Sequence, residues 1–136
     1  MFLTIVGGND GKKDLNTSES IFLKIATAGP QLPFSVSFHC MVQIDVQNFL
    51  IVGGKQDNKN SRSTWNIEYI GNQFKVTEGA LMNQDRRLHS CGRMIDKDGK
   101  TVFIAVGGKD QYGKSLDTVE LLYSPQSGVW RYGTLT

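Results

Sequence analysis

The residues best suited to chemistry are two His/Cys pairs, His39 with Cys40 and His89 with Cys91. Imidazole and thiolate are ligands that Zn²⁺ prefers, so the two pairs together could supply the four ligands of a zinc site. Cys40 directly follows its histidine, whereas Cys91 stands two residues after its own. Because side chains alternate between the faces of a strand, the two cysteines are predicted to point to opposite faces. We therefore expect neither a metal site nor a disulfide, and expect each histidine to orient a local loop.

No other pattern in the chain indicates catalysis or a cofactor. The sequence contains no GxSxG nucleophile motif and no phosphate-binding glycine loop, and its glycine pairs stand at strand ends with no following helix. Asp96 and Asp98 flank a hairpin tip, where a turn explains them. We predict that the protein is not an enzyme and binds no cofactor.

Composition predicts a folded, soluble domain without a charged or apolar segment that selects a partner. Hydrophobic residues make up 39% and charged residues 21% of the 136 residues, and the net charge is +2, which argues against nucleic acid as a partner. No apolar run is long enough to span a membrane, and Gly7-Gly8 interrupts the N-terminal run before a signal-peptide core could form. We expect a cytoplasmic protein over a secreted one, although the sequon at Asn16 is a weak pointer to secretion.

Three apolar runs that each end in a glycine pair organise the chain, at 2–8, 49–54 and 102–108. Their first glycines are 46 and 54 residues apart, a period that fits the blades of a propeller. Fifteen glycines against three prolines, with β-branched and aromatic residues throughout, favour short strands and tight turns over helices. We predict an all-β protein.

Further strands and polar loops surround each apolar run. A polar loop follows each glycine pair, at 9–19, 55–63 and 109–116. Alternating or apolar segments predict the remaining strands, at 21–25, 37–44, 65–69, 74–77, 89–95, 118–123 and 129–132. A four-stranded antiparallel meander is therefore complete twice and partial once.

These residues resemble the kelch repeat, in which an apolar strand ends in Gly-Gly and a Tyr and then a Trp follow. The third unit matches closely, the second has Phe74 in place of the Trp, and the first lacks both aromatics. The hallmark residues are Gly7, Gly8, Gly53, Gly54, Tyr69, His89, Gly107, Gly108, Tyr123 and Trp130. The resemblance implies a partial blade at 1–34 and blades at 35–82 and 83–136.

Physical reasoning assigns packing roles to these hallmark residues. The glycines suit a strand end that turns with positive φ close to the next blade, and the aromatics suit the wedge between blades. Propellers close with roughly four to eight blades, which is more than this chain supplies. We therefore expect a partial kelch-type β-propeller that is a fragment of a larger one or that closes a ring by self-association.

In the kelch family, the loops between the second and third strands share one face of the ring with the links between blades, and this face commonly binds a protein or peptide. The corresponding segments here hold nine of the fifteen basic residues, so we predict a non-catalytic protein-interaction module for an acidic peptide. The candidate binding residues are Lys12, Lys13, Lys55, Lys59, Arg62, Arg86, Arg87, Lys109, Tyr112 and Lys114. Arg86 could instead serve the turn of its own repeat, and the acidic residues of the same loops also fit a merely solvated surface.

Three larger interpretations remain open from the sequence. The resemblance implies an adaptor that presents substrates to a ubiquitin ligase. The alternatives are a fragment of a kelch-type enzyme with a ring-centre site near His39 and His89, or an incomplete gene product without a function of its own.

Overall fold

The protein is all-β, as predicted. The computed structural model describes residues 2–22, 25–28, 30–71, 73–125 and 128–133, and these ranges contain strands, turns and loops but no helix. Nothing in them forms a helix long and apolar enough to cross a bilayer.

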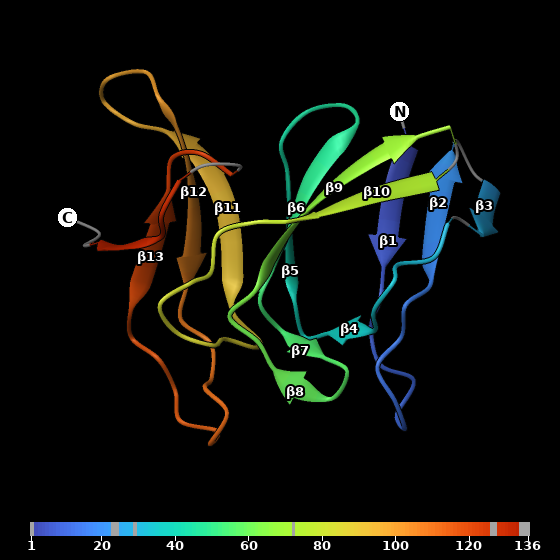
Figure 1. Ribbon diagram of the computed structural model, residues 1–136, viewed down its shortest axis with the longest axis horizontal. Coiled ribbons are helices and arrows are strands. Elements are labelled where there is room, and N and C mark those ends of the chain that lie inside the picture. The colour runs from blue at the N-terminus through green and yellow to red at the C-terminus, as the bar shows by residue number, and fades with distance from the viewer. Residues whose placement is uncertain (1, 23–24, 29, 72, 126–127, 134–136) are drawn as a thin grey trace.

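Three antiparallel meander sheets follow one another along the chain (Figure 1). The first contains β1 (Phe2–Val6), β2 (Ser18–Phe22) and β3 (Ile25–Ala28). The second contains β5 (Cys40–Gln43), β6 (Asn48–Val52), β9 (Thr64–Ile70) and β10 (Gln73–Glu78). The third contains β11 (Ser90–Ile95), β12 (Thr101–Val106), β13 (Val119–Leu122) and β14 (Arg131–Gly133). Both four-stranded meanders predicted from the sequence are therefore present.

Two details of the strand prediction were wrong. In the first sheet, β2 begins at Ser18 and a separate β3 follows, where a single strand at 21–25 was predicted. The predicted loop at 55–63 holds a small hairpin of β7 (Lys55–Gln56) and β8 (Lys59–Asn60), which pairs with β4 (Val36–Ser37). Its turn residues Asp57 and Asn58 both have positive φ, as in the tight turns that join hairpin strands. In the predicted Gly71-Asn72 turn, Asn72 lies outside the described residues.

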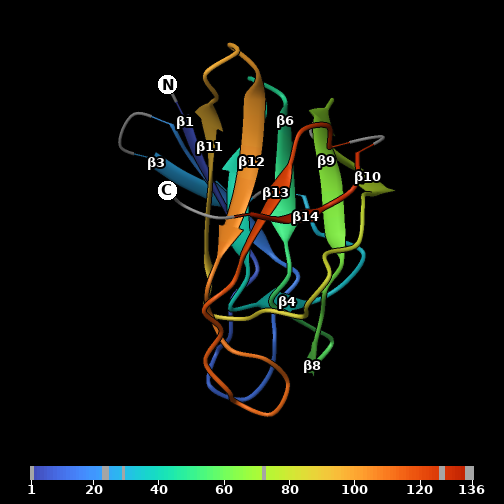
Figure 2. The same cartoon turned by 90° about the vertical axis from the view of Figure 1, so that its left-hand side faces the viewer.

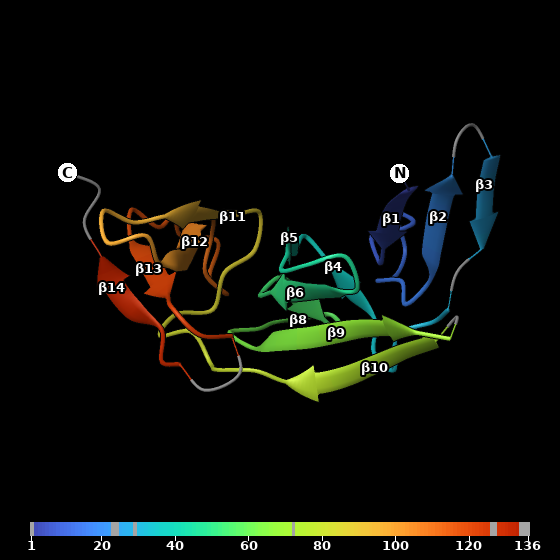
Figure 3. The same cartoon turned by 90° about the horizontal axis from the view of Figure 1, so that it is seen from above.

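The three sheets stand face to face and fan out, with β3, β10 and β14 outermost (Figure 3). Strand β6 contributes core residues to both faces of the second sheet, because its side chains alternate between the two faces. Leu50 and Val52 belong to the core toward the third sheet, and Ile51 belongs to the core toward the first. All three side chains are fully buried, and burial of each contributes about 1.5–3 kcal/mol.

The glycine pairs set the distance between successive sheets. The amide of Gly54 donates to the carbonyl of Arg86 at 2.6 Å, and the amide of Gly8 donates to the carbonyl of Val36 at 2.7 Å. All six glycines of the pairs have positive φ, as expected. A Cβ at Gly53 would lie 2.8 Å from the carbonyl oxygen of Arg86, which is closer than packing allows. Glycine is therefore required where one sheet meets the next.

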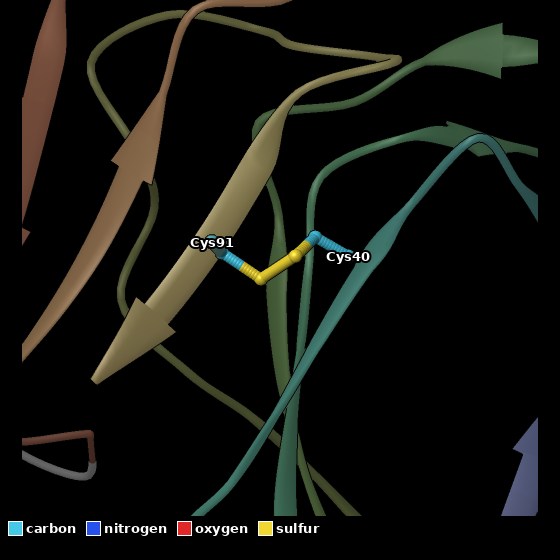
Figure 4. Close-up of a disulfide and its surroundings, with 2 residues drawn as sticks. All are labelled: Cys40 and Cys91. Atoms are coloured by element: carbon cyan, nitrogen blue, oxygen red, sulfur yellow. A yellow bond between two sulfur atoms is a disulfide. The ribbon is translucent and has the colours of Figure 1, made fainter.

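A disulfide joins Cys40 to Cys91, which corrects the prediction that these residues stay unpaired (Figure 4). The two Cα atoms are 5.9 Å apart, within the range that a disulfide spans. Within one sheet the facing argument is sound, but β5 and β11 belong to neighbouring sheets. The face of the second sheet that carries Cys40 is turned toward the third sheet, and the opposite face of the third sheet, which carries Cys91, is turned toward the second. The one-residue difference in spacing from the histidines therefore brings the two sulfurs together.

Loss of this disulfide should destabilise the fold. It closes a sequence separation of 51 residues, for which the chain-entropy model gives about 4 kcal/mol. We expect the Cys40→Ser/Cys91→Ser variant to lose about 2–4 kcal/mol of unfolding free energy in urea titrations. Addition of a reductant should weaken the wild-type chain by a similar amount and leave the variant unchanged. Free thiols in the non-reduced wild-type chain would contradict the assignment.

The glycine contacts make a second stability prediction with a built-in control. Gly53 and Gly107 are the first glycines of their pairs and have φ values of 59° and 66°. A Cβ at Gly107 would meet only the Leu116 carbonyl oxygen, at 3.5 Å. Both alanine variants carry the cost of positive φ, but only Gly53→Ala also overlaps a neighbouring sheet. We expect Gly53→Ala to cost about 1–3 kcal/mol more than Gly107→Ala in chemical denaturation. Equal losses would show that this contact does not set the spacing.

Candidate functional site

Four segments that join strands or sheets gather at one edge of the molecule, which we call the loop edge. They are residues 7–17, 53–63, 83–89 and 107–118, and both side views place them together at the bottom of the fold (Figures 1 and 2). Arg87 and Lys109 exchange backbone hydrogen bonds of 3.0 and 2.9 Å, which fixes the sheet-joining segment against the third loop. The amide of Gly54 donates to the carbonyl of Arg86 and the amide of Asn58 donates to the Asp14 carboxylate, so all four segments of the loop edge are linked to one another.

Aspartates shape the turns that present the lysines of the loop edge. The Asp10 carboxylate accepts the backbone amides of Lys12 and Lys13, each at 2.9 Å. Asp110 accepts the amides of Tyr112 and Lys114 in the same way, also at 2.9 Å. These backbone hydrogen bonds hold the pKa of Asp10 below its ordinary value. The aspartates thus order the backbone while the neighbouring side chains project into solvent.

Asp14 ties the first loop to the second sheet. Its carboxylate is buried and accepts hydrogen bonds from the Ser37 hydroxyl, the Asn9 amide group and the Asn58 backbone amide. Burial acts to raise the pKa of Asp14, but these three donors outweigh it and keep the pKa below its ordinary value. The sequence analysis assigned Asp14 only to a polar loop and so missed this structural role.

Most of the predicted binding residues are exposed on the loop edge. Those with exposed side chains are Lys12, Lys13, Lys59, Arg62, Lys109, Tyr112 and Lys114, while Lys55 and Arg87 are partly buried. The four segments contain nine basic and six acidic residues, and the acidic side chains at 10, 14, 57, 85 and 110 all accept hydrogen bonds. In the described ranges, the single ion pair is Arg86–Glu120. In those ranges the exposed cations of the loop edge therefore lie beyond ion-pair distance of any carboxylate, although Lys13 and Lys55 still act electrostatically on Asp10 and Asp14.

Arg86 does not belong to the exposed set. Its side chain and that of Glu120 are fully buried, and its Nη2 donates to the Glu120 carboxylate at 2.9 Å. Its remaining guanidinium donors reach the carbonyls of Gly107 and Thr118 and the Thr118 hydroxyl. Arg86 thus holds the sheet-joining segment on the third sheet and is not accessible to a partner, which is the role in its own repeat that the sequence left open.

The two histidines make the same contact in successive units. His39 packs over Gly7 and His89 packs over Gly53, with ring carbons 3.3 and 3.0 Å from where a glycine Cβ would stand. The cysteines beside them are joined to each other, so neither is a thiolate ligand. Among the described residues, no three His, Cys, Asp or Glu side chains converge as a metal site would require.

The aromatic hallmarks differ in their surroundings. Trp130 is buried in the core between the second and third sheets, which is the packing role expected of it. Tyr69 packs edge-on against Phe74 at 5.8 Å. Ile67 pairs with Phe49, and Leu122 pairs with Phe103. Phe49 and Phe103 each stand four residues before their glycine pair, so Ile67 and Leu122 occupy equivalent positions. Tyr123 therefore corresponds in space to residue 68 of the second sheet, one position away from Tyr69, because the third loop is one residue longer.

Comparisons with known proteins identify a shared fold. No protein-family model and no curated protein sequence matches the chain. Among solved structures 122 chains are similar to it, so the fold recurs. One of them, described as "Structure of YjhT", superimposes with a TM-score of 0.65 at 14% sequence identity. The match covers 90% of this chain and 40% of that one, so this chain spans less than half the length of that structure.

The buried His89 predicts a specific loss of stability in mild acid. Burial is the main cause that lowers the pKa of His89 to about 4, and the charge of Arg86 adds to it; burial lowers the pKa of His39 as well. Between the unfolded pKa near 6.5 and the folded pKa, the unfolded chain binds more protons, so stability falls as the pH falls. We expect a loss of about 2–3 kcal/mol between pH 7 and 4.5.

The His89→Gln variant isolates this effect. Its unfolding free energy should change much less over the same pH range, because glutamine does not titrate. Urea unfolding at several pH values measures both chains. Parallel curves for the variant and the wild type would exclude His89 as the cause.

Proposed function

We propose that this chain is a non-catalytic protein-interaction module of the kelch type, part of a larger propeller, whose loop edge binds an acidic peptide. The observation that carries the proposal is the set of exposed cations that three separate loops, 7–17, 53–63 and 107–118, present on one edge. The four segments of the loop edge hold nine basic and six acidic residues, so the edge carries an excess of positive charge that a carboxylate-rich partner would complement.

The arrangement of the chain supports a recognition role over a catalytic one. Glycines, histidines, Trp130 and Arg86 all serve contacts between sheets, so they are committed to packing. The loops instead project into solvent from a fixed framework, which is the usual placement of binding residues. The similar solved structure extends well beyond the part that this chain covers, which supports assignment of the chain to a larger ring.

The chemistry of the loop edge favours a peptide over nucleic acid. Single-stranded nucleic acid is held by aromatic platforms on which bases stack as well as by positive charge. Tyr112 is the aromatic side chain that the described loop segments expose. Lysines and arginines spread over several loops suit instead a flexible acidic segment that makes several separate charge contacts.

Charge reversal on the loop edge tests this function. The probe is a fluorescein-labelled peptide of alternating Glu and Gly residues, followed by anisotropy. One reversal in each loop, Lys12→Glu/Lys59→Glu/Lys114→Glu, should weaken binding by at least about tenfold, since each exposed charge contact contributes up to about 1 kcal/mol. Binding of the wild type should also weaken with added salt.

A matched variant controls for net charge. Lys75, Lys97 and Lys100 are exposed and lie away from the loop edge, on β10 and the β11–β12 turn. Their triple reversal to Glu changes the net charge equally and should change binding by less than about threefold. Equal effects of the two triple variants, or tighter binding of a single-stranded DNA with the same number of charges, would exclude the proposed site.

A further inference from the structure

In the part of the chain that the structure describes, strand β1 has one unpaired edge, whereas its counterparts β6 and β12 are paired on both sides. β6 lies between β5 and β9, and β12 lies between β11 and β13. Among the described residues, β1 pairs with β2 alone. The backbone N–H and C=O groups along its other side are therefore available to a further strand.

The third sheet shows how the segment before such a strand is anchored. Arg86 precedes β11 and donates to the Glu120 carboxylate, to the Thr118 hydroxyl and to the Gly107 and Thr118 carbonyls. Thr118 and Glu120 are two residues apart, at the start of β13. Thr118 and Glu120 together form a binding site for one guanidinium group.

The first sheet has a threonine and a glutamate at the positions equivalent to this guanidinium-binding site. Thr17 corresponds to Thr118, because their carbonyls accept the amides of Gly7 and Gly107 at 2.8 and 3.1 Å. Glu19 pairs with Ile5 just as Glu120 pairs with Ala105, so the two glutamates also correspond. Thr17 and Glu19 are exposed. Within the described ranges, the Glu19 side chain makes no hydrogen bond or ion pair.

The second sheet supports this correspondence by lacking both halves of the contact. Ser63 and Trp65 stand where the third sheet has Thr118 and Glu120. The segment before β5 has Val36 where Arg86 stands, since the carbonyls of both residues accept the amide of the preceding glycine pair. Thr-x-Glu thus occurs with an arginine and Ser-x-Trp occurs with a valine, so the Thr17-x-Glu19 pair indicates an arginine partner.

We infer that the first sheet takes up an extended polypeptide segment from outside residues 2–133, which adds a strand to β1 and places an arginine on Thr17 and Glu19. The segment would carry Arg-x-x-His followed by a strand, as at 86–95. By analogy with the pairing of Ser90 with Val106, the residue after its histidine would pair with Val6. Main-chain hydrogen bonds would supply affinity and the arginine would supply specificity.

A labelled peptide of residues 82–95 with Cys91 replaced by Ser is the probe, added to the intact chain and followed by anisotropy. Glu19→Gln in the protein should weaken binding by at least about tenfold, because a charged hydrogen-bond partner is lost. Glu78→Gln, at an exposed site on β10, is the matched control and should change binding by less than about twofold. In the peptide, Arg86→Gln should weaken binding as strongly, whereas Arg87→Gln should change it by less than about threefold.

Hydrogen exchange locates the bound peptide. Slower exchange of the amides of Phe2–Val6 on addition of the peptide supports strand addition to β1. Three outcomes would overturn the inference: no binding up to about 1 mM peptide, equal effects of the Glu19→Gln and Glu78→Gln variants, or protection confined to β12. The last outcome would mean that the peptide replaces the chain's own 82–95 segment in the third sheet. These results do not depend on the loop edge, so they test this site separately from the proposed function.

Discussion

The close approach between each glycine pair and the segment that enters the next sheet is the contact on which the rest of the structure depends. The amides of Gly8 and Gly54 donate to carbonyls of Val36 and Arg86 at 2.7 and 2.6 Å, and a Cβ at Gly53 would lie 2.8 Å from the Arg86 carbonyl oxygen. At this spacing the faces of successive sheets interdigitate, and β6 can bury residues on both sides. A side chain at Gly53 would push the third sheet away from the second and open the core between them.

The same stacking explains features that one sheet alone does not. Alternate side chains of a strand face different neighbours, so Cys40 and Cys91 meet although they point to opposite faces of equivalent strands. The buried Arg86–Glu120 pair is likewise a contact between a sheet and the segment that enters it. The disulfide thus joins the second and third sheets, whereas the ion pair holds the segment that enters the third sheet on that same sheet, and removal of either partner of the ion pair would leave a buried charge.

Much of this fold could be predicted from the sequence, because its information is local and repeated. Three apolar runs with glycine pairs predicted the strands, the meander order and the positive φ values. The errors came from contacts between distant segments. The disulfide prediction applied a rule for one strand to two sheets, and Arg86 was grouped with surface cations because burial beside Glu120 depends on a strand 34 residues away. The Asp57-Asn58 turn was a local signal that could have predicted the β7–β8 hairpin.

The distribution of charge separates the structural part of the loop edge from the part that can bind. Asp10, Asp14 and Asp110 accept hydrogen bonds from the backbone or side chains that shape their loops, so each carboxylate is held within the fold. Lysine side chains are long and flexible and lose conformational entropy when fixed, so they remain in solvent unless a partner compensates them. Sequence composition counts both kinds of charge equally and gives a nearly neutral chain. The folded surface keeps both kinds of charge, but it fixes the carboxylates in the turns of the loops and leaves the lysine side chains in solvent.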